Sequence, residues 1–248
     1  MTLEEYMNCH EKLKKMKFSA MAEELRLQYE APNADLLSFE ERIKRLVEAE
    51  WKMRYDKKFA RLLKQANLKI TDASFDETLY DPKRKLDTVT IERLMDCNWI
   101  DEGRNLLITG FTGAGKSYFA HSMAIAALKQ FKTVRYVRSE ILLKEFDALR
   151  VLDEPDKTLK MIEEYSSVDL LIIDDFGLME LDINKCRDLF TILDGREGRR
   201  STIVVSQIPV SEWYNLFKNS TYADACLDRL LHRAYRLNFQ GESLRTRQ

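Results

Sequence analysis

A glycine-rich segment constrains this chain more than any other feature of its sequence. Leu106, Leu107 and Ile108 form an apolar run of strand length, and residues 110–117, GFTGAGKS, follow it and satisfy the pattern G-x-x-x-x-G-K-[ST]. Residues 118–130 are good helix formers with apolar side chains three and four positions apart, so a helix is expected next. Strand, glycine loop and helix in this order are the context that a phosphate-binding loop requires. The segment therefore predicts a nucleoside triphosphate site.

The residues of this loop have distinct expected roles. Backbone N–H groups of a glycine loop at a helix N-terminus can surround phosphate oxygens. Lys116 is expected to place a positive charge on the β- and γ-phosphates, and Ser117 to offer a hydroxyl ligand to Mg²⁺. A glycine turn that fits the pattern by chance is the alternative, and the flanking strand and helix argue against it. The predicted nucleotide-binding set is Gly110, Phe111, Thr112, Gly113, Ala114, Gly115, Lys116, Ser117 and Tyr118.

Composition limits the classes of protein to which the chain can belong. With 248 residues, 45% of them hydrophobic and 33% charged, it is expected to be globular, with room for one large α/β domain and a smaller appendage. Lysine and arginine number 40 and aspartate and glutamate 41, so the bulk charge does not indicate nucleic-acid binding. The N-terminal segment lacks an apolar signal core, and no run reaches about 18 apolar residues. We therefore expect a cytoplasmic protein without a membrane partner.

Two domains are expected from the pattern of the chain. Residues 1–70 are predicted to form a small all-helical domain and residues 71–248 a larger α/β domain. The polar segment of residues 67–85, which contains a proline, is the connector in which we place the boundary.

Capping-box spacings predict where two of the N-terminal helices begin. Thr2 stands three positions before Glu5 and predicts a first helix, and Ser38 stands three positions before Glu41 and predicts a long helix that ends near residue 66. A shorter helix is expected between them. The apolar stripe of the long helix is predicted to consist of Leu46, Met53 and Leu62, with Ile43, Val47, Trp51 and Phe59 beside them.

The opposite face of the long helix is basic. Residues 42–69 contain ten lysines and arginines against three acidic residues. A solvated helix face is one interpretation of such a run, and contact with phosphates or with an acidic partner is the other. The sequence favours neither interpretation over the other.

Beyond the connector, apolar segments of strand length alternate with amphipathic helices. Besides residues 106–108, strands are expected over residues 133–137, 168–173, 201–207 and 236–239. Asp182 is expected to cap a helix over residues 184–194, and a last helix is expected over residues 227–235. The near-continuous apolar run of the third segment is typical of a strand buried on both faces of a parallel sheet. The alternation predicts a right-handed, doubly wound α/β fold of the P-loop class, with a five-stranded parallel sheet flanked by helices.

Trp99 and Ile100 precede the central strand, in a turn that is expected over residues 98–100. Apolar groups just before a phosphate-binding loop often form a wall of the base pocket, and these two residues are candidates for that wall. Core packing is the alternative reading of the same pair.

Polar side chains end two of the predicted strands. Asp174 and Asp175 follow a buried apolar run, at the edge of the sheet where ligands bind in open α/β folds. Asp174 is expected to hold Mg²⁺ opposite Ser117, and Asp175 to orient an attacking water or accept its proton. Gln207, after the fourth strand, offers an amide to the γ-phosphate or to that water. Together with the loop, these groups predict nucleoside triphosphate hydrolysis.

Several segments together resemble a known family. They are KLKKMKFSAMAEEL, EAEWKMRYDKKFARLLKQANL, NLLITGFTGAGKSYFAHSMA, DLLIIDDFG and STIVVSQIPVSEWYNLF…ADACLDRLLHRAYRLNFQGESLR. In them the chain resembles the AAA+ ATPases of the DnaC/IstB clade, in particular the IstB-type helpers of insertion-sequence transposition. The resemblance runs nearly end to end, and its last segment is the most diagnostic, because generic P-loop proteins lack it.

The resemblance implies roles for individual residues. Asp174 and Asp175 match the Walker B motif, whose second residue is usually Glu. The shorter Asp is expected to slow hydrolysis, because it reduces the reach to the attacking water by one methylene. Gln207 falls at the sensor-one position, where helicase-loader relatives tend to have Asn. The residues that match the Walker A motif are Gly110, Gly113, Gly115, Lys116 and Ser117.

Two arginines near the C-terminus gain expected roles in the same way. Arg229, in the tripeptide DRL, matches the arginine finger that acts on the nucleotide of a neighbouring subunit. Arg245, in GESLR, is similar to the sensor-two arginine. Arg196 and Arg200 are alternative finger candidates, and simple pairing of Arg229 with Asp228 or another carboxylate is the structural alternative.

The resemblance therefore implies an ATPase that uses ATP and Mg²⁺, assembles into an oligomer on duplex DNA, and recruits or activates a cognate transposase at target DNA. A DnaC-like loader of the replicative helicase is the alternative, but such loaders tend to carry an N-terminal cluster of metal-binding cysteines, and the N-terminal domain here has only Cys9. A small-molecule P-loop kinase is disfavoured because no basic, lid-like segment follows the predicted sheet.

Overall fold

The computed structural model describes residues 2–32, 36–75 and 87–240 of the chain. The chain divides into two compact units, residues 1–61 and 62–248, and the division falls inside the long helix α3 (Phe39–Ala66). A domain boundary at residue 70 stays a prediction. Among the described residues, no helix combines the length and the apolar composition that crossing a bilayer requires.

The first unit contains α1 (Leu3–Lys15), α2 (Ser19–Glu30) and most of α3. The capping box expected at the start of α1 is present: the Glu5 N–H donates to Thr2 Oγ1, and the Thr2 N–H donates to Glu5 Oε2. The three helices predicted here from the sequence are confirmed, and the long one ends at Ala66, as expected.

A buried glutamate anchors α3 to the start of α2. Glu50 is 5% exposed, and its Oε2 accepts hydrogen bonds from the N–H groups of Ala20 and Met21 at 3.0 and 3.2 Å. Since the N-cap residue Phe18 makes no side-chain hydrogen bond, Glu50 satisfies free N–H groups of α2 from another helix. Arg54 pairs with Glu50 at 2.7 Å and lies over the Phe18 ring.

The apolar stripe expected along α3 is only partly buried. Leu46 and Met53 are half-buried, but Ile43, Val47 and Trp51 are 43%, 52% and 68% exposed. The prediction of one packed stripe is therefore wrong for these three residues. The reason is that α3 contacts α2 through a neighbouring row of side chains, which includes Arg42 and the buried Glu50.

The second unit is built on one parallel sheet with strand order β2-β3-β4-β1-β5, which confirms the predicted fold class. Its strands are β1 (Leu106–Gly110), β2 (Val134–Arg138), β3 (Leu170–Phe176), β4 (Ser201–Ser206) and β5 (Tyr235–Phe239). Its remaining elements are α4 (Thr88–Met95), α5 (Asn98–Asp101), α6 (Lys116–Lys129), α7 (Ser139–Val151), α8 (Pro155–Ser167), α9 (Ile183–Arg196), the 3-10 helix η4 (Val210–Leu216) and α10 (Ser220–Leu231).

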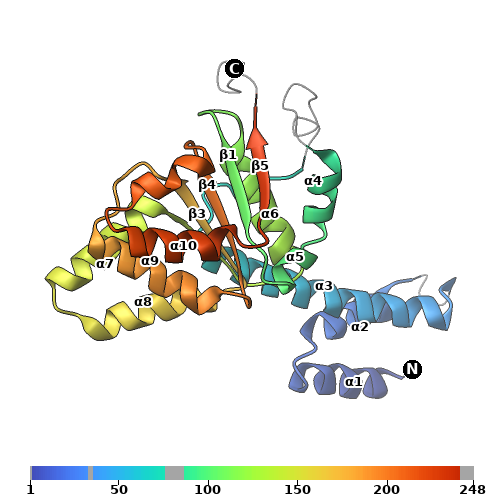
Figure 1. Ribbon diagram of the computed structural model, residues 1–248. Helices are drawn as coiled ribbons and strands as arrows, with labels where there is room; N and C mark the ends of the chain where they lie inside the picture. The colour runs from blue at the N-terminus through green and yellow to red at the C-terminus, as the bar shows by residue number, and fades with distance from the viewer. Residues whose placement is uncertain (1, 33–35, 76–86, 241–248) are drawn as a thin grey trace. The chain divides into compact units, whose positions relative to one another are not determined.

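Helices cover both faces of this sheet, with α6 on one side and α9 and α10 on the other (Figure 1). Alternate strand residues face opposite sides. Leu107, Leu171 and Val204 belong to the buried cluster beneath α7 to α10. Their neighbours Ile108 and Ile172 are also buried, on the side of the sheet that α6 contacts. Burial on both faces explains why these strands are apolar throughout.

Two elements differ from the sequence-based expectation. Residues 98–100, expected to form a turn, belong to the short helix α5, which follows Cys97 in a left-handed conformation with φ 56°. The last helix, expected over residues 227–235, starts earlier and ends before β5 begins. Asn219 starts it by accepting a hydrogen bond from the Tyr222 N–H, a capping signal that the sequence reading missed.

A buried asparagine ties the beginning of the central strand to its surroundings. Asn105, directly before β1, donates from Nδ2 to the carbonyl oxygens of Arg229 and Leu230 at 2.8 and 3.2 Å. Its Oδ1 accepts a hydrogen bond from the Thr202 N–H at 2.9 Å. The side chain therefore joins β1, β4 and the C-terminal turn of α10 at one end of the sheet.

Candidate functional site

A pocket of about 320 Å³ lies at the carboxyl ends of β1, β3 and β4. Ligands of open parallel sheets bind at this edge. The structure thus brings together the glycine loop, the paired aspartates and the polar end of β4, which are far apart in the sequence. The lining residues are Ile70, Thr112, Gly113, Gly115, Lys116, Ser117, Tyr118, Asp174, Asp175, Val205, Ser206 and Gln207.

Asp174 is a buried carboxylate held by hydrogen bonds from three directions. It is 3% exposed, and its Oδ1 accepts from Ser117 Oγ at 3.2 Å and from the Asp175 N–H at 2.8 Å. Its Oδ2 accepts from the Tyr136 hydroxyl at 2.8 Å. Burial, together with the adjacent carboxylate, raises the pKa of Tyr136, so this hydroxyl keeps its proton and remains a donor. These bonds offset part of the cost of burying the charge.

An irregularity at the end of β3 turns both aspartates toward the pocket. In a regular strand, consecutive side chains point to opposite faces of the sheet. Here the register with β4 shifts between Ile173 and Phe176, and Asp175 has a left-handed backbone with φ 57°. A shift of this kind re-aims side chains. As a result, Asp174 and Asp175 border the same pocket.

Arg138, at the end of β2, contacts the second aspartate. Its Nε lies 3.2 Å from Asp175 Oδ2, and the Ser139 hydroxyl donates to the Asp175 carbonyl oxygen at 3.0 Å. The two ionic side chains are 47% and 29% exposed. Since partly exposed ion pairs contribute about 1 kcal/mol or less to stability, the pair serves mainly to orient the carboxylate.

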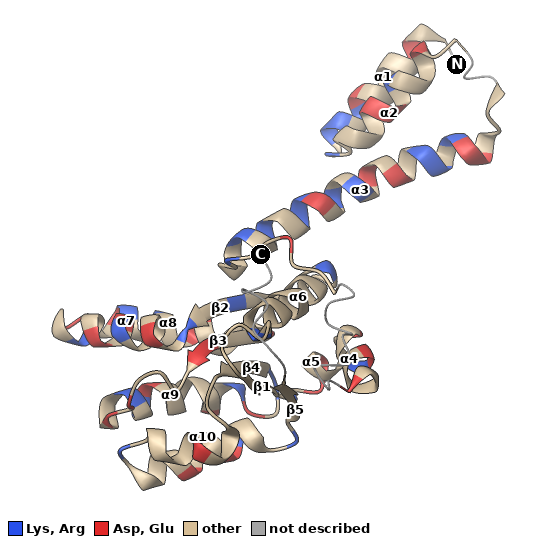
Figure 2. Cartoon of the chain, turned by 90° about the horizontal axis from the view of Figure 1, so that it is seen from above, with Lys and Arg blue, Asp and Glu red and all other residues tan. Residues whose placement is uncertain are grey.

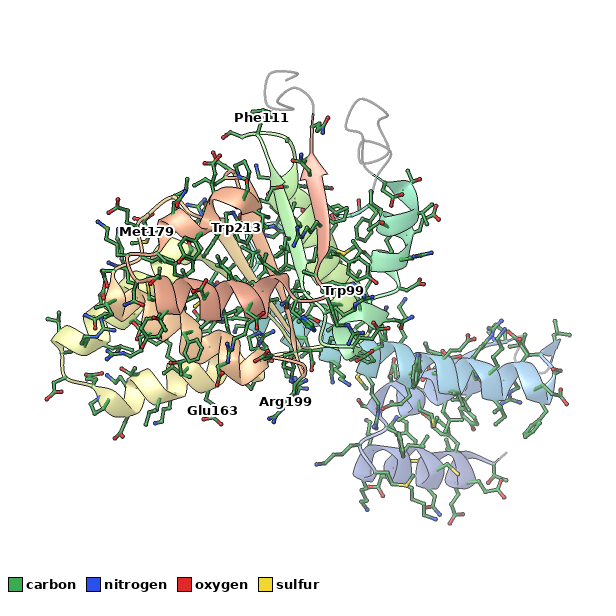
Figure 3. All side chains as sticks on the ribbon, in the orientation of Figure 1. Trp99, Phe111, Glu163, Met179, Arg199 and Trp213 are labelled. Atoms are coloured by element: carbon green, nitrogen blue, oxygen red, sulfur yellow. The ribbon has the colours of Figure 1, made fainter. Side chains whose placement is uncertain are left out.

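The glycine loop presents its charged and polar groups to the pocket. Lys116 is 6% exposed and its Nζ donates to the Phe111 carbonyl oxygen at 2.7 Å. Thr112 Oγ1 donates to Gln207 Oε1 at 2.6 Å, which links the loop to the end of β4. The Phe111 side chain is 74% exposed at the tip of the loop (Figure 3), and Ala114 is buried away from the pocket lining.

The residues that follow α3 close one side of the pocket. Ile70 is part of its lining. The Lys69 N–H donates to His121 Nε2 and the Ser74 N–H donates to the Tyr118 hydroxyl, each at 3.3 Å. This segment, expected to be a polar connector only, is therefore attached to the first turns of α6.

His121 links the connector to the loop residue Ser117. Because its Nε2 accepts from a backbone N–H, its proton lies on Nδ1, which donates to the Ser117 carbonyl oxygen at 2.6 Å. Burial lowers the pKa of His121 and favours this neutral form. The ring also lies 4.5 Å from the Tyr136 ring, measured between centroids. His121 thus contacts both the loop helix and the hydrogen-bond donor of the buried aspartate.

Trp99 and Ile100 do not line the pocket, which corrects one of the two interpretations of this pair. Each is 2% exposed, and Trp99 Nε1 donates to the Leu94 carbonyl oxygen at 3.0 Å. The Ser201 hydroxyl, at the start of β4, donates to the Trp99 carbonyl oxygen. Trp99 therefore lies at the opposite end of the sheet from Phe111 (Figure 3) and belongs to the core.

Arg229 lies away from the pocket, at the amino end of β1. Its backbone carbonyl accepts from Asn105, whereas the glycine loop follows the other end of that strand. At about 3.3 Å per residue, β1 separates the two positions by roughly 16 Å. The Arg229 guanidinium pairs with Asp194 at 2.6 Å and Glu197 at 3.2 Å and lies over the Phe190 ring. Its carboxylate partners are thus at the C-terminal end of α9 and just beyond it, and Arg229 does not reach the nucleotide pocket of its own chain.

The other arginines singled out by the sequence differ in what they can contact. Arg196 is 1% exposed, and its guanidinium donates to Thr202 Oγ1 and to the carbonyl oxygens of Tyr165 and Val168, so it is committed to the core. Arg200 pairs with Asp169. Arg245 lies outside the described residues.

The donor set at the bottom of the pocket fits Mg²⁺. The carboxylate of Asp174 and the hydroxyl of Ser117 are oxygen donors in contact with each other, and hard cations such as Mg²⁺ prefer oxygen ligands. The buried negative charge of Asp174 has hydrogen-bond donors around it but no ion-pair partner that the structure records within the described part of the chain. A divalent cation between these two groups would supply the missing positive charge.

Four residues of the site were not predicted from the sequence. Tyr136 and Arg138 come from β2, His121 from the middle of α6, and Ile70 from the connector. Only Ile70 left a signal, and a weak one, as one of several apolar residues in a polar segment. The other three act through contacts between elements that are distant in the sequence, which periodicity and local spacing do not encode.

Comparison with known proteins places the chain in one family. The sequence profile of the family described as IstB-like ATP binding protein matches residues 11–248. An insertion sequence ATP-binding protein of Sinorhizobium fredii is 38% identical over 238 residues, which are 96% of each chain. The ATP-binding protein of insertion sequence IS1162 from Pseudomonas fluorescens is 37% identical over 199 residues, 80% of this chain and 85% of that one.

Solved structures with a similar fold come from replication proteins. The DnaC helicase loader superposes with a TM-score of 0.52 and 18% identity over 72% of this chain and 98% of that one. Domain III of the replication initiation protein DnaA from Thermotoga maritima gives a TM-score of 0.51 and 19% identity over 64% of this chain and 65% of that one. At such identities the likeness concerns the fold alone.

The first glycine of the loop is required by packing as well as by conformation. Gly110 has φ 139°, and a Cβ added there would lie 2.2 Å from the Phe239 carbonyl oxygen of β5. Gly198 also has a positive φ, 67°, but an added Cβ would meet no atom within 4 Å. Alanine substitutions at the two positions therefore distinguish the cost of a steric clash from the cost of a left-handed backbone.

We expect Gly110→Ala to lower the free energy of unfolding by more than about 3 kcal/mol, because strand β5 must move away from β1. Gly198→Ala should lower the free energy of unfolding by only about 1 kcal/mol, because an alanine disfavours the left-handed backbone conformation. Urea denaturation of both variants measures the difference. Equal losses in the two proteins would contradict the steric argument.

Proposed function

Since the chain belongs to the family of IstB-like ATP binding proteins, we propose that it hydrolyses ATP and uses the nucleotide to assemble on duplex DNA and to recruit or activate a transposase. It is an ATP-binding P-loop protein of the AAA+ fold, with homologues named for insertion sequences. The observation that carries the proposal is the single pocket that unites Lys116, Ser117, Asp174 and Asp175.

Nucleotide binding is assigned to the loop and the turn that follows it. The backbone N–H groups at the N-terminus of α6 would surround the phosphates, and Lys116 would exchange its bond to the Phe111 carbonyl for bonds to the β- and γ-phosphates. Ser117 and Asp174 would hold Mg²⁺, which when bound neutralises charge on the phosphates. Tyr118 and Ile70 would contact the rest of the nucleotide, because both line the pocket.

Hydrolysis is assigned to the two groups that border the pocket beyond the loop. Asp175 would orient the attacking water and accept its proton, and its contact with Arg138 would keep the carboxylate directed toward the pocket. Gln207 would orient the γ-phosphate or the water through its side-chain amide. The oxygen of that amide accepts a hydrogen bond from Thr112, which holds the side chain in place. Asp in place of the usual Glu shortens the reach to the water, so slow turnover is expected.

A complete site would need a neighbouring chain. Arg229 is too far from its own pocket to act there, so a role as arginine finger requires action on the nucleotide of an adjacent subunit. Self-assembly in the presence of ATP would then complete the active site. Arg245 as a sensor-two arginine stays a prediction from the family resemblance.

DNA contact is assigned to the basic segment of α3. Two arginines of that helix hold other groups of the first unit: Arg42 donates to Gln28 Oε1 and Arg54 pairs with Glu50. Lys57, Lys58 and Arg61 are exposed in consecutive turns of the helix. Clustered cations of this kind read phosphates rather than bases, so little sequence preference is expected. Helicase loading remains the alternative function, and the structural likeness to DnaC does not favour it because it concerns the fold alone.

The first test separates nucleotide binding from hydrolysis. Lys116→Ala should abolish ATP binding, because it removes the cation that neutralises the phosphates. Asp175→Asn should bind ATP normally and hydrolyse it at least about 100-fold more slowly, because the amide cannot accept a proton. Calorimetry and phosphate release measure the two properties. Normal turnover by Asp175→Asn would exclude this residue as the base.

The second test asks whether Arg229 acts between subunits. Arg229→Ala alone should lose about 10³-fold or more in turnover. Mixing it with Asp175→Asn, which is inactive for a different reason, should restore activity, because the intact pocket of one variant then receives the arginine of the other. Arg200→Ala tests the alternative finger in parallel. The role belongs to Arg200 if two results are found together. The mixture of Arg229→Ala with Asp175→Asn stays inactive, and Arg200→Ala is inactive alone but regains activity when it is mixed with Asp175→Asn.

The third test measures DNA binding across salt concentrations with and without ATP. ATP should raise the apparent affinity and steepen the salt dependence, because an assembled oligomer repeats its phosphate contacts along the duplex. Changing Lys57, Lys58 and Arg61 to Ala should reduce the slope by about two to three per chain. The control changes Lys12, Lys14 and Lys15 of α1 to Ala and should leave the slope unchanged. An unaltered slope in the first variant would place the contact outside α3.

A further inference from the structure

Strand β2 supplies two side chains to the edge of the pocket, and they contact different aspartates. Tyr136 and Arg138 stand two positions apart, so they project from the same face of the strand. The basic end of β2 lies beside the acidic end of β3, where Arg138 and Asp174 are register partners (Figure 2). The Tyr136 hydroxyl donates to Asp174 Oδ2 at 2.8 Å, whereas Arg138 Nε lies 3.2 Å from Asp175 Oδ2. Each aspartate therefore has its own contact on the neighbouring strand.

The Tyr136 hydroxyl determines the orientation of the Asp174 carboxylate. Among the described residues it is the only donor that the structure records to Oδ2, because the hydrogen bonds from Ser117 Oγ and from the Asp175 N–H both reach Oδ1. Bonds to a single oxygen restrict rotation about the Cβ–Cγ bond only weakly, since that torsion has broad minima. A third bond, to the other oxygen, removes this freedom. The hydroxyl thus fixes the plane of a carboxylate that is assigned to Mg²⁺.

The Tyr136 ring is itself held in place by α6. The residue is buried on the α6 side of the sheet, since its neighbour Val137 belongs to the buried cluster on the other side. The His121 ring lies 4.5 Å from the Tyr136 ring, measured between centroids. His121 Nδ1 donates to the carbonyl oxygen of Ser117, one turn earlier in α6, at 2.6 Å. The position of the tyrosine is therefore tied to the residue whose hydroxyl is the other candidate metal ligand.

These contacts form a closed circuit around the two candidate ligands. Ser117 donates to Asp174, and Asp174 accepts from Tyr136. The Tyr136 ring contacts His121, and His121 donates back to Ser117. Asp174, Tyr136 and His121 are each 3% exposed or less, so water cannot easily replace a contact that is lost. A circuit of this kind fixes two ligands relative to each other before a cation binds. Ligands that are preorganised in this way bind more tightly, because they lose less freedom on binding.

From this circuit we infer that Tyr136 is a positioning residue for the bound divalent cation. Its hydroxyl fixes the Asp174 carboxylate beside Ser117 and so determines how tightly the nucleotide-bound chain holds Mg²⁺. The inference rests on the nucleotide site proposed above and adds to it a residue that belongs to neither the glycine loop nor the aspartate pair. Arg138 orients the other aspartate and does not contribute to metal affinity. The two side chains of β2 therefore divide metal binding from hydrolysis.

The experiment measures by calorimetry how much Mg²⁺ tightens the binding of a non-hydrolysable ATP analogue to the full chain. The dissociation constant in EDTA divided by that in excess Mg²⁺ gives this magnesium factor. Tyr136→Phe should lower the magnesium factor about 10–100-fold, as expected when a hydrogen-bond partner of a metal ligand is removed, and should leave the affinity in EDTA unchanged. Tyr165→Phe makes the same chemical change at a position that is also 3% exposed, where the ring contacts Arg135. This matched control should keep the wild-type factor.

The outcomes separate this inference from the proposed function. A wild-type chain whose affinity for the analogue does not depend on Mg²⁺ contradicts the metal site itself, and the inference falls with it. If the wild-type chain shows the dependence and Tyr136→Phe retains the full magnesium factor, the hydroxyl is only structural. That result overturns the inference and leaves the proposed site intact. His121→Phe keeps a ring beside Tyr136 but loses the bond to Ser117. It should also lower the factor, to a smaller extent, and it tests the same circuit if Tyr136→Phe does not fold.

The magnesium dependence of ATP turnover tests the division between the two side chains of β2. Tyr136→Phe should hydrolyse ATP slowly at low Mg²⁺ and regain most of the wild-type rate at saturating Mg²⁺, because a higher concentration compensates for weaker binding. Arg138→Gln should keep the wild-type magnesium factor but lose about tenfold or more in turnover at every Mg²⁺ concentration, because Asp175 is misplaced. A Tyr136→Phe protein that saturating Mg²⁺ does not rescue, or an Arg138→Gln protein that it does rescue, contradicts the assignment.

Discussion

The hydrogen bonds of the buried Asp174 carboxylate are the interactions on which the arrangement of the site depends. They join three elements at the edge of the sheet: Ser117 in the first turn of α6, Tyr136 on β2, and the backbone of Asp175 at the end of β3. A charge taken out of water at this position is costly, and each of these donors offsets part of that cost. Because the donors come from separate elements, these hydrogen bonds form only when the strands pack in this arrangement. The geometry of the pocket therefore depends on the packing of the sheet. His121 extends the same network to the connector that follows α3.

The two ends of β1 have different relations to the nucleotide. At its carboxyl end the loop builds the pocket, whereas at its amino end Asn105 fixes the last turn of α10 and hence Arg229. The length of the strand keeps the two apart. An arginine placed in this way does not reach the nucleotide pocket of its own chain, so the proposed finger role requires a neighbouring chain, which is why the proposed chemistry and self-assembly are linked.

Much of the fold was predictable because its signals are local. Apolar runs gave the strands, and capping residues such as Thr2 and Asp182 marked helix starts that the structure confirms. The reading failed where burial depends on another element. Trp51 has the spacing of a core residue yet is exposed, and Trp99 lies near the loop in sequence yet packs at the far end of the sheet. Periodicity identifies a helical face, but it does not say what covers that face.

The sequence by itself determined the chemistry that the chain carries: a glycine loop ending in Lys116 and Ser117, a carboxylate pair after an apolar strand, and the order of strands and helices that brings them to one edge. Only the tertiary structure decided how these groups are held. The register shift at Asp175, its contact with Arg138 and the hydrogen bond from Tyr136 arise between segments separated by dozens of residues. Such contacts follow from the packing of the whole sheet, because no local pattern fixes which side chain of one strand meets which group of the next.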